Sequence, residues 1–160
     1  MGERHAVVER LRLLAMHDFV ADLPSNWLHR LAVAGRPVYF AAGRRLCRED
    51  APAEQFWLLH SGAVAVDFSV PGHGNIVVER VGAGAPVGWS WMRPPFRWRF
   101  GAIVAEDIRA LEFDAARVRN LIAEDAEPGQ ELTGRMLDVV TDRLQHARHR
   151  LIEVYAYPGD

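Results

Sequence analysis

The sequence has no lysine, a single cysteine and no long apolar run. All nineteen basic residues are arginines, and twenty-one acidic residues give a formal net charge of −2. Without a basic excess the chain lacks the electrostatic field that nucleic acids attract, so we expect no direct DNA binding. No segment reaches the ~20 apolar residues that span a bilayer, so we expect no membrane contact.

The single cysteine, Cys47, excludes an internal disulfide and fits a reducing compartment. The charged residues 1–5 lack the apolar segment of a secretory signal. We therefore expect a cytoplasmic protein. Its 160 residues, with 49% apolar and 25% charged side chains, are typical of one globular domain over 1–160.

The domain divides into three parts: N-terminal helices over 1–35, a β-roll over 36–113 and C-terminal helices over 114–156. Apolar residues at helical spacing predict a first helix over 3–16. Ser25 is predicted to cap a second helix, and Gly35 to close it.

From residue 36 the apolar period changes to two, and glycine or proline recurs about every ten residues. This spacing is typical of a sandwich or jelly roll rather than of parallel βαβ units. Residues 100–104 and 108–113 are predicted to be the last two strands. Turns are predicted at Gly43, Pro52, Gly62, Pro71-Gly72, Gly74, Gly82 and Gly84.

Asp114 is predicted to open a short helix, and one long helix follows Pro128 to about Tyr155. Apolar residues in the long helix alternate steps of three and four, which is the heptad pattern of a helix that pairs with a partner helix. We expect a two-fold homodimer through this helix; the alternative is a monomer with one broad core-facing stripe. The predicted interface residues are Leu137, Val140, Leu144, Ala147, Leu151 and Val154.

The segment from Gly84 to Trp91, followed by Pro94 to Phe100, combines paired glycines with two arginines among aromatic side chains. Backbone N–H groups beside Gly88 and a guanidinium from Arg97 or Arg99 suit an anion such as a phosphate.

Several spaced residues resemble the cyclic nucleotide-binding domain of catabolite activator/Fnr-type regulators. They are Gly43, Leu46, Glu49-Asp50-Ala51, Phe56 to Leu59, Ser61 to Val66, Gly74, Gly84, Gly88 and Arg143-Leu144-Gln145. The resemblance implies an α+β fold: an eight-strand β jelly roll with N-terminal helices and a long C-terminal dimerisation helix. Relatives that bind DNA continue into a helix-turn-helix, whereas this chain ends at Asp160, so we expect a stand-alone domain.

The resemblance also implies where a ligand binds. The family's phosphate-binding cassette begins at Gly88, whose missing Cβ lets the backbone approach the phosphate. The family's ribose-binding glutamate is replaced here by Trp89, which offers a donor but no acceptor. Losing that partner costs about 1–3 kcal/mol. The candidate ligand-binding residues are Val87, Gly88, Trp89, Ser90, Trp91, Arg97, Trp98, Arg99, Phe100 and Arg148.

Three functions remain open. The first is a sensor that binds cyclic AMP, another cyclic nucleotide or a related anionic ligand and signals through the dimer helix to an unidentified effector protein. The second is a ligand-free dimeric adaptor whose pocket is plugged by Trp89, Trp91 and Trp98. The third is a haem or redox sensor using Cys47 or a histidine, although no ligand spacing marks a metal site. The sequence lacks a nucleophile elbow and a phosphate-binding Walker loop, so we expect no enzyme.

Overall fold

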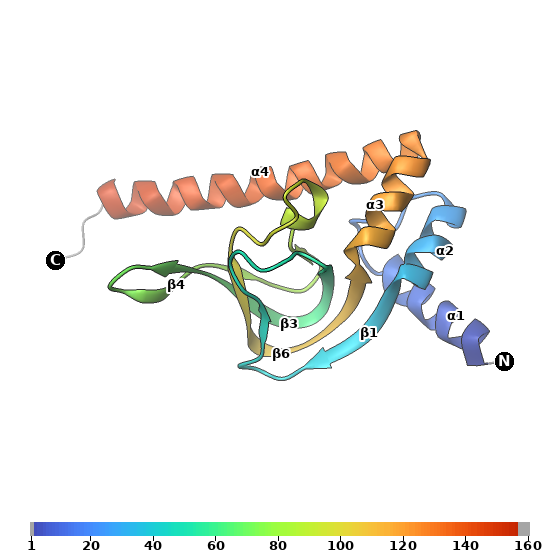
Figure 1. Cartoon of the computed structure of the whole chain (residues 1–160), viewed down its shortest axis with the longest axis horizontal. Coiled ribbons are helices and arrows are strands. Elements are labelled where there is room, and N and C mark those ends of the chain that lie inside the picture. The colour runs from blue at the N-terminus through green and yellow to red at the C-terminus, as the bar shows by residue number, and fades with distance from the viewer. Residues whose placement is uncertain (1, 157–160) are drawn as a thin grey trace.

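The computed structural model describes residues 2–156 as a six-stranded antiparallel sheet rolled around an apolar core and flanked by four helices (Figure 1). The helices α1 (Gly2–Ala15), α2 (Ser25–Ala34) and α3 (Ala115–Glu124) gather at one end of the roll. The helix α4 (Ala126–Ala156) lies along one side of the roll and extends past it (Figure 1). The expectation that the chain ends shortly after the long helix concerns residues 157–160, which lie outside the described residues.

The strands are β1 (Gly35–Phe40), β2 (Arg45–Cys47), β3 (Gln55–Val70), β4 (Gly74–Val81), β5 (Pro86–Val87) and β6 (Gly101–Asp114). Their main order is β1-β6-β3-β4, with β2 paired to β6 and β5 paired to β3. The centre of the sheet is the long pair of β3 and β6, which runs from Gln55 opposite Asp114 to Asp67 opposite Gly101.

The sheet has six strands and not the expected eight. The strand β3 continues through Gly62, and β6 continues through residues 105–107, where the sequence predicted breaks. Gly62 does not end β3 in a turn but takes a φ of +85°, and the register with β6 shifts on both sides of it. A Cβ on Gly62 would lie 2.1 Å from the carbonyl oxygen of Asp107 in β6. The glycine therefore lets β3 bulge and bend against β6 without separating from it.

The helix boundaries follow local chemistry. Asp114 caps α3 as predicted, because its Oδ1 accepts the backbone N–H of Arg117 at 3.2 Å. The prediction that Ser25 caps α2 is wrong: the cap position is Pro24, and no side chain bonds to the helix start. Pro24 has a φ of −53° and a ψ of 144°, and its carbonyl accepts the backbone N–H of Leu28 at 3.0 Å.

The core is continuous between the sheet and the helices. It contains Trp27 and Leu31 of α2, Val118 and Leu121 of α3, and Met136 of α4, all buried. The last half of α4 contributes no buried residue to this core, since the buried positions of the helix end at Met136.

Candidate functional site

The predicted cassette is the connection between β5 and β6. The short strand β5 pairs with β3, placing Val87 opposite Trp57 in the core. Gly88 follows with a φ of +102°, and a 3-10 turn, η1 (Ser90–Met92), comes next. The Pro94–Pro95 peptide bond is cis. The chain then runs through residues 96–100 into β6.

Gly88 is covered by the indole of Trp98. A Cβ built on Gly88 would lie 2.7 Å from Cη2 and 2.8 Å from Cζ3 of that ring. Trp98 is 4% exposed and stacks on Trp57, with ring centroids 6.0 Å apart. The close approach that only glycine permits at position 88 is thus made by a side chain of the protein itself.

Trp91 is fully buried beneath the same segment. Its ring stacks on Phe56 at 4.1 Å between centroids, and its Nε1 donates to the carbonyl of Gly88 at 3.0 Å. The buried Ser90 hydroxyl accepts the backbone N–H of Arg99 at 3.2 Å. These bonds join the two ends of the cassette to each other.

Trp89 is half-buried and occupies a different place from Trp98. Its ring packs against that of Phe100, with 5.5 Å between the ring centroids, and lines an apolar cavity of about 500 Å³. The opposite wall of that cavity is formed by α3 and α4, including Met136 and Leu137. Trp89 therefore contributes to the contact between the cassette and the long helix.

Exposed and buried side chains alternate over residues 97–100. Trp98 and Phe100 are buried, whereas Arg97 and Arg99 are exposed. Arg97 donates from Nη1 to the carbonyl oxygen of Asp50 at 2.6 Å. The side chain of Arg99 has no hydrogen bond or ion pair with any residue from 2 to 156. Both arginines thus lie on the face of this segment opposite to the ring that covers Gly88.

The long helix is tied to the roll by an arginine that sequence reasoning gave no role. Arg143 of α4 donates to the carbonyl of Pro86 and pairs with Glu79 of β4 at 3.3 Å. Burial of its guanidinium lowers the pKa of Arg143, while the charge of Glu79 opposes this shift. The predicted ligand residue Arg148 is exposed further along α4 and has no such bond to the described cassette. The only sequence signal for Arg143 was its place in the family resemblance.

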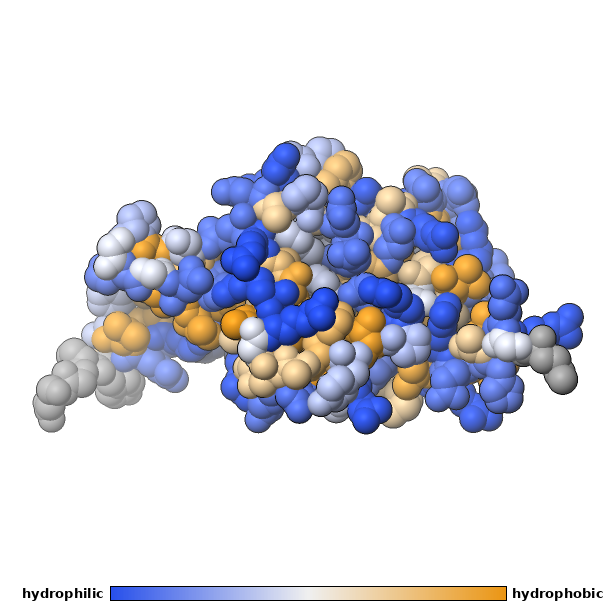
Figure 2. Space-filling model, turned by 60° about the horizontal axis from the view of Figure 1, so that its bottom comes forward, coloured by the Kyte–Doolittle hydropathy of each residue, from blue (hydrophilic) through white to orange (hydrophobic). Residues whose placement is uncertain are grey.

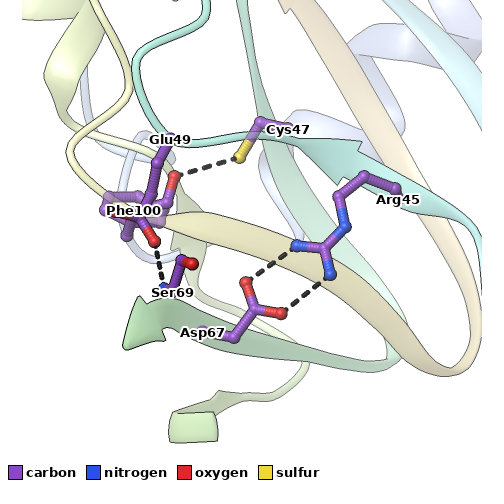
Figure 3. A network of polar contacts seen from close by, with 6 residues as sticks. All are labelled: Arg45, Cys47, Glu49, Asp67, Ser69 and Phe100. Carbon is purple, nitrogen blue, oxygen red and sulfur yellow. Dashed lines mark hydrogen bonds and ion pairs between the residues drawn. The ribbon is translucent and has the colours of Figure 1, made fainter. Parts of the chain in front are cut away.

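A polar network holds the start of β6 (Figure 3). Arg45 binds both carboxylate oxygens of Asp67 at 2.8 Å, and this hydrogen bonding raises the pKa of Arg45. The pair lies directly over Gly101, where a Cβ would be 2.3 Å from Asp67 Oδ1. Close by, the carboxylate of Glu49, in the loop after β2, accepts the backbone N–H of Ser69 in β3.

The titratable groups proposed for redox or haem chemistry lie in separate places, with Cys47 and His17 buried and His60 half-buried. Cys47 lies under Phe100, and burial raises the pKa of its thiol to about 12. His17 and His60 approach each other at 2.6 Å between Nε2 and Nδ1, and burial is the main cause that lowers the pKa of each, that of His60 to about 4. Within residues 2–156, no three His, Cys, Asp or Glu side chains gather as a metal would require.

None of the helices in the described part of the chain is both long enough and apolar enough to span a bilayer.

Comparisons with known proteins agree with this architecture. A putative cyclic nucleotide-binding protein of Geobacter metallireducens GS-15 is 25% identical with a TM-score of 0.75, over 83% of this chain and 96% of that one. A cyclic nucleotide-binding domain of Methylobacillus flagellatus KT is 19% identical with a TM-score of 0.74, over 96% of this chain and 85% of that one. The regulatory domain of Toxoplasma gondii PKA with cAMP is 15% identical with a TM-score of 0.70, over 84% of this chain and 51% of that one.

No protein of curated function matches the sequence. The family described as cyclic nucleotide-binding domain matches residues 37–125, which is more than half of the chain and includes the whole cassette. With the rolled sheet, the glycine-led cassette and the long final helix in place, this match shows that the chain belongs to the cyclic nucleotide-binding domain family.

Proposed function

We propose that this chain is a non-catalytic regulatory domain whose cassette is closed by its own aromatic side chains. It then acts as a protein-interaction module and not as a receptor for a cyclic nucleotide. The observation that carries the proposal is the indole of Trp98 within van der Waals contact of Gly88, where the family's cassette receives a phosphate.

Two further features support a closed cassette. Trp91 fills the space beneath it, and its indole N–H is already bonded to the Gly88 carbonyl. Opening the site for a ligand would expose buried aromatic surface, which is unfavourable by about 25 cal/mol for each Å² of apolar area returned to water. At the ribose position, the Trp89 indole provides no acceptor for a sugar hydroxyl.

Binding of nucleotides tests this directly. Isothermal titration of the protein with cyclic AMP, cyclic GMP and cyclic di-GMP should give no heat of binding. Micromolar affinity for any of the three would contradict the closed cassette.

The interaction surface of this module is the apolar seam of α4 that its predicted heptad residues form. Its predicted heptad residues are exposed in the single chain: Leu137 by 64%, Leu144 by 49%, Leu151 by 56% and Val154 by 67%. Ala147 is exposed as well, and Val140 is half-buried at the edge of the cavity that Trp89 lines. The C-terminal half of α4 and the β3–β4 hairpin extend towards the same end of the molecule (Figure 1), where apolar side chains are exposed (Figure 2).

A helix with an exposed heptad seam requires a partner helix to cover it. We take this partner to be a second copy, related by a two-fold axis, with the resulting dimer presented to an effector protein. Sedimentation should show a dimer that Leu144→Glu converts to a monomer, whereas the off-seam control Gln145→Glu should remain dimeric. A monomeric wild-type protein would contradict the dimer without affecting the closed cassette.

A nucleotide sensor is the second candidate, favoured by one observation. The Arg99 side chain is exposed and bonded to no described residue, so its guanidinium is free to bind a phosphate. In a sensor, Trp98 would have to leave Gly88 before the nucleotide could enter. The titrations above distinguish the two candidates, because only the sensor would give heat together with a change in tryptophan fluorescence.

A further inference from the structure

A cavity of about 850 Å³ lies away from Gly88, between the N-terminal helices and α3. Its volume falls in the range of about 300–1,000 Å³ typical of small-molecule sites. The walls are the junction of α2 with β1, the loop before β3, the first turns of α3, and Phe96 of the cassette.

Four arginines from three elements line this cavity: Arg10 of α1, Arg36 of β1, and Arg117 and Arg119 of α3. Arg119 is held in place, because its Nη1 donates to the carbonyl of Trp91 at 2.9 Å. Its guanidinium also lies 4.1 Å from the centre of the Phe96 ring. A guanidinium carries five N–H donors, so these contacts leave most of the donors of Arg119 available.

The carboxylates of the cavity are largely committed to other partners. Glu112 accepts two bonds from Arg36, at 2.9 and 2.7 Å, and one from the indole of Trp57 at 2.9 Å. Asp114 caps α3 through the backbone N–H of Arg117 at 3.2 Å.

With Arg36 neutralised by Glu112, three cations remain in the wall: Arg10, Arg117 and Arg119. The remaining carboxylates are those of Asp114 and the exposed Glu54. The wall is therefore positive by one charge, with its free guanidinium groups concentrated on α3.

We propose that this cavity binds a small organic anion that carries a phosphate or a carboxylate group. Arg117 binds the anionic group, since the paired N–H donors of its guanidinium match the oxygens of both chemistries. The side chain of Arg117 is exposed and has no hydrogen bond or ion pair within residues 2–156. The ring of Phe96, stacked on Arg119, provides a flat apolar wall for the rest of the ligand.

A ligand in this cavity would also act on the cassette. Arg119 holds the backbone of Trp91, and the indole of Trp91 holds the carbonyl of Gly88. Arg119 additionally lines the apolar cavity between the cassette and α4. A ligand that packs on the Phe96 ring beside Arg119 would therefore bias the contact between cassette and long helix while Trp98 keeps the nucleotide site closed.

The test follows the melting temperature of the protein with two probes, inorganic phosphate and citrate, each against sodium chloride at equal ionic strength. We expect a saturable rise with at least one probe, and the responding probe identifies phosphate or carboxylate as the ligand chemistry. Arg117→Glu should weaken the apparent affinity at least ten-fold, since a charge-assisted bond becomes a repulsion.

Two charge reversals elsewhere serve as comparisons. Arg48→Glu, in the exposed loop after β2 and outside the cavity, and Arg99→Glu, in the cassette, should both retain the response to the anion. The proposal is overturned if neither probe gives a saturable rise, if Arg117→Glu responds like the wild type, or if Arg99→Glu abolishes the response. Far-UV circular dichroism of each variant confirms that the fold is intact.

Discussion

Replacing Gly88 with alanine measures how tightly the cassette is closed. The added Cβ would lie 2.7 Å from Cη2 and 2.8 Å from Cζ3 of Trp98, closer than carbon atoms approach without displacement. Overpacking of this kind costs about 1–3 kcal/mol. The φ of +102° adds strain of about 1–2 kcal/mol for a residue with a side chain. We therefore expect Gly88→Ala to lower the free energy of unfolding by about 2–5 kcal/mol.

The two contributions can be separated in urea unfolding followed by circular dichroism. Gly84→Ala is the matched control, because Gly84 also has a positive φ, +88°, but no atom lies within 4 Å of its would-be Cβ. It should show the backbone strain alone, about 1–2 kcal/mol. In a Trp98→Leu background the indole atoms are absent, so Gly88→Ala should cost only this smaller amount as well.

The difference between the costs of Gly88→Ala in the two backgrounds is the coupling energy between Gly88 and Trp98. We expect about 1–3 kcal/mol, as for residues in direct contact. Costs that agree within about 0.5 kcal/mol in both backgrounds would refute the reasoning, since Trp98 would then not occupy the space over Gly88.

Three other properties follow from the buried polar groups. His60 has its pKa lowered to about 4 from 6.5, chiefly by burial, so the unfolded chain binds the proton first. The contribution of His60 to the free energy of unfolding should then be complete above about pH 6.5. It should fall by roughly 2 kcal/mol as the pH drops towards 4. A free energy of unfolding of the wild-type protein that does not change over this pH range would contradict this. The Cys47 thiol, with its pKa near 12, should react with Ellman's reagent only after denaturation, not in the native protein. Arg45→Leu should lower the free energy of unfolding by about 3 kcal/mol, because it leaves Asp67, 6% exposed, without its partner; a loss below about 1 kcal/mol in urea would refute this.

Much of the fold could be predicted because it depends on local chemistry and on periodicity. The change of apolar period near residue 36 separates helices from strands, and Asp114 marks the start of α3 by its capping side chain. The merging of eight expected strands into six could not be predicted in this way. A glycine such as Gly62 looks the same in sequence whether it ends a strand or permits a bulge. Only the partner strand, with the carbonyl of Asp107 at that position, decides between the two.

That the segment of Gly88 lies between the strands and is not part of a helix could be predicted, whereas the contact of Trp98 with Gly88 could not. The glycines and the arginines in the sequence pointed to an anion, and the family resemblance placed a phosphate at Gly88. The alternation Arg97, Trp98, Arg99, Phe100 carried a signal that was available in the sequence. An aromatic residue at every second position before a buried strand predicts that the aromatic side chains face the core and the arginines face solvent. That Trp98 reaches Gly88 depends on the path of residues 92–96, which no periodicity encodes.

The central claim is that Trp98 occupies the place of a ligand over Gly88. A crystal structure of the protein grown with saturating cyclic AMP tests it most directly. The account predicts that the indole remains against Gly88 and that no nucleotide is bound in the cassette. A cyclic phosphate hydrogen-bonded to the backbone beside Gly88, with Trp98 displaced and Arg99 turned towards it, would contradict the account.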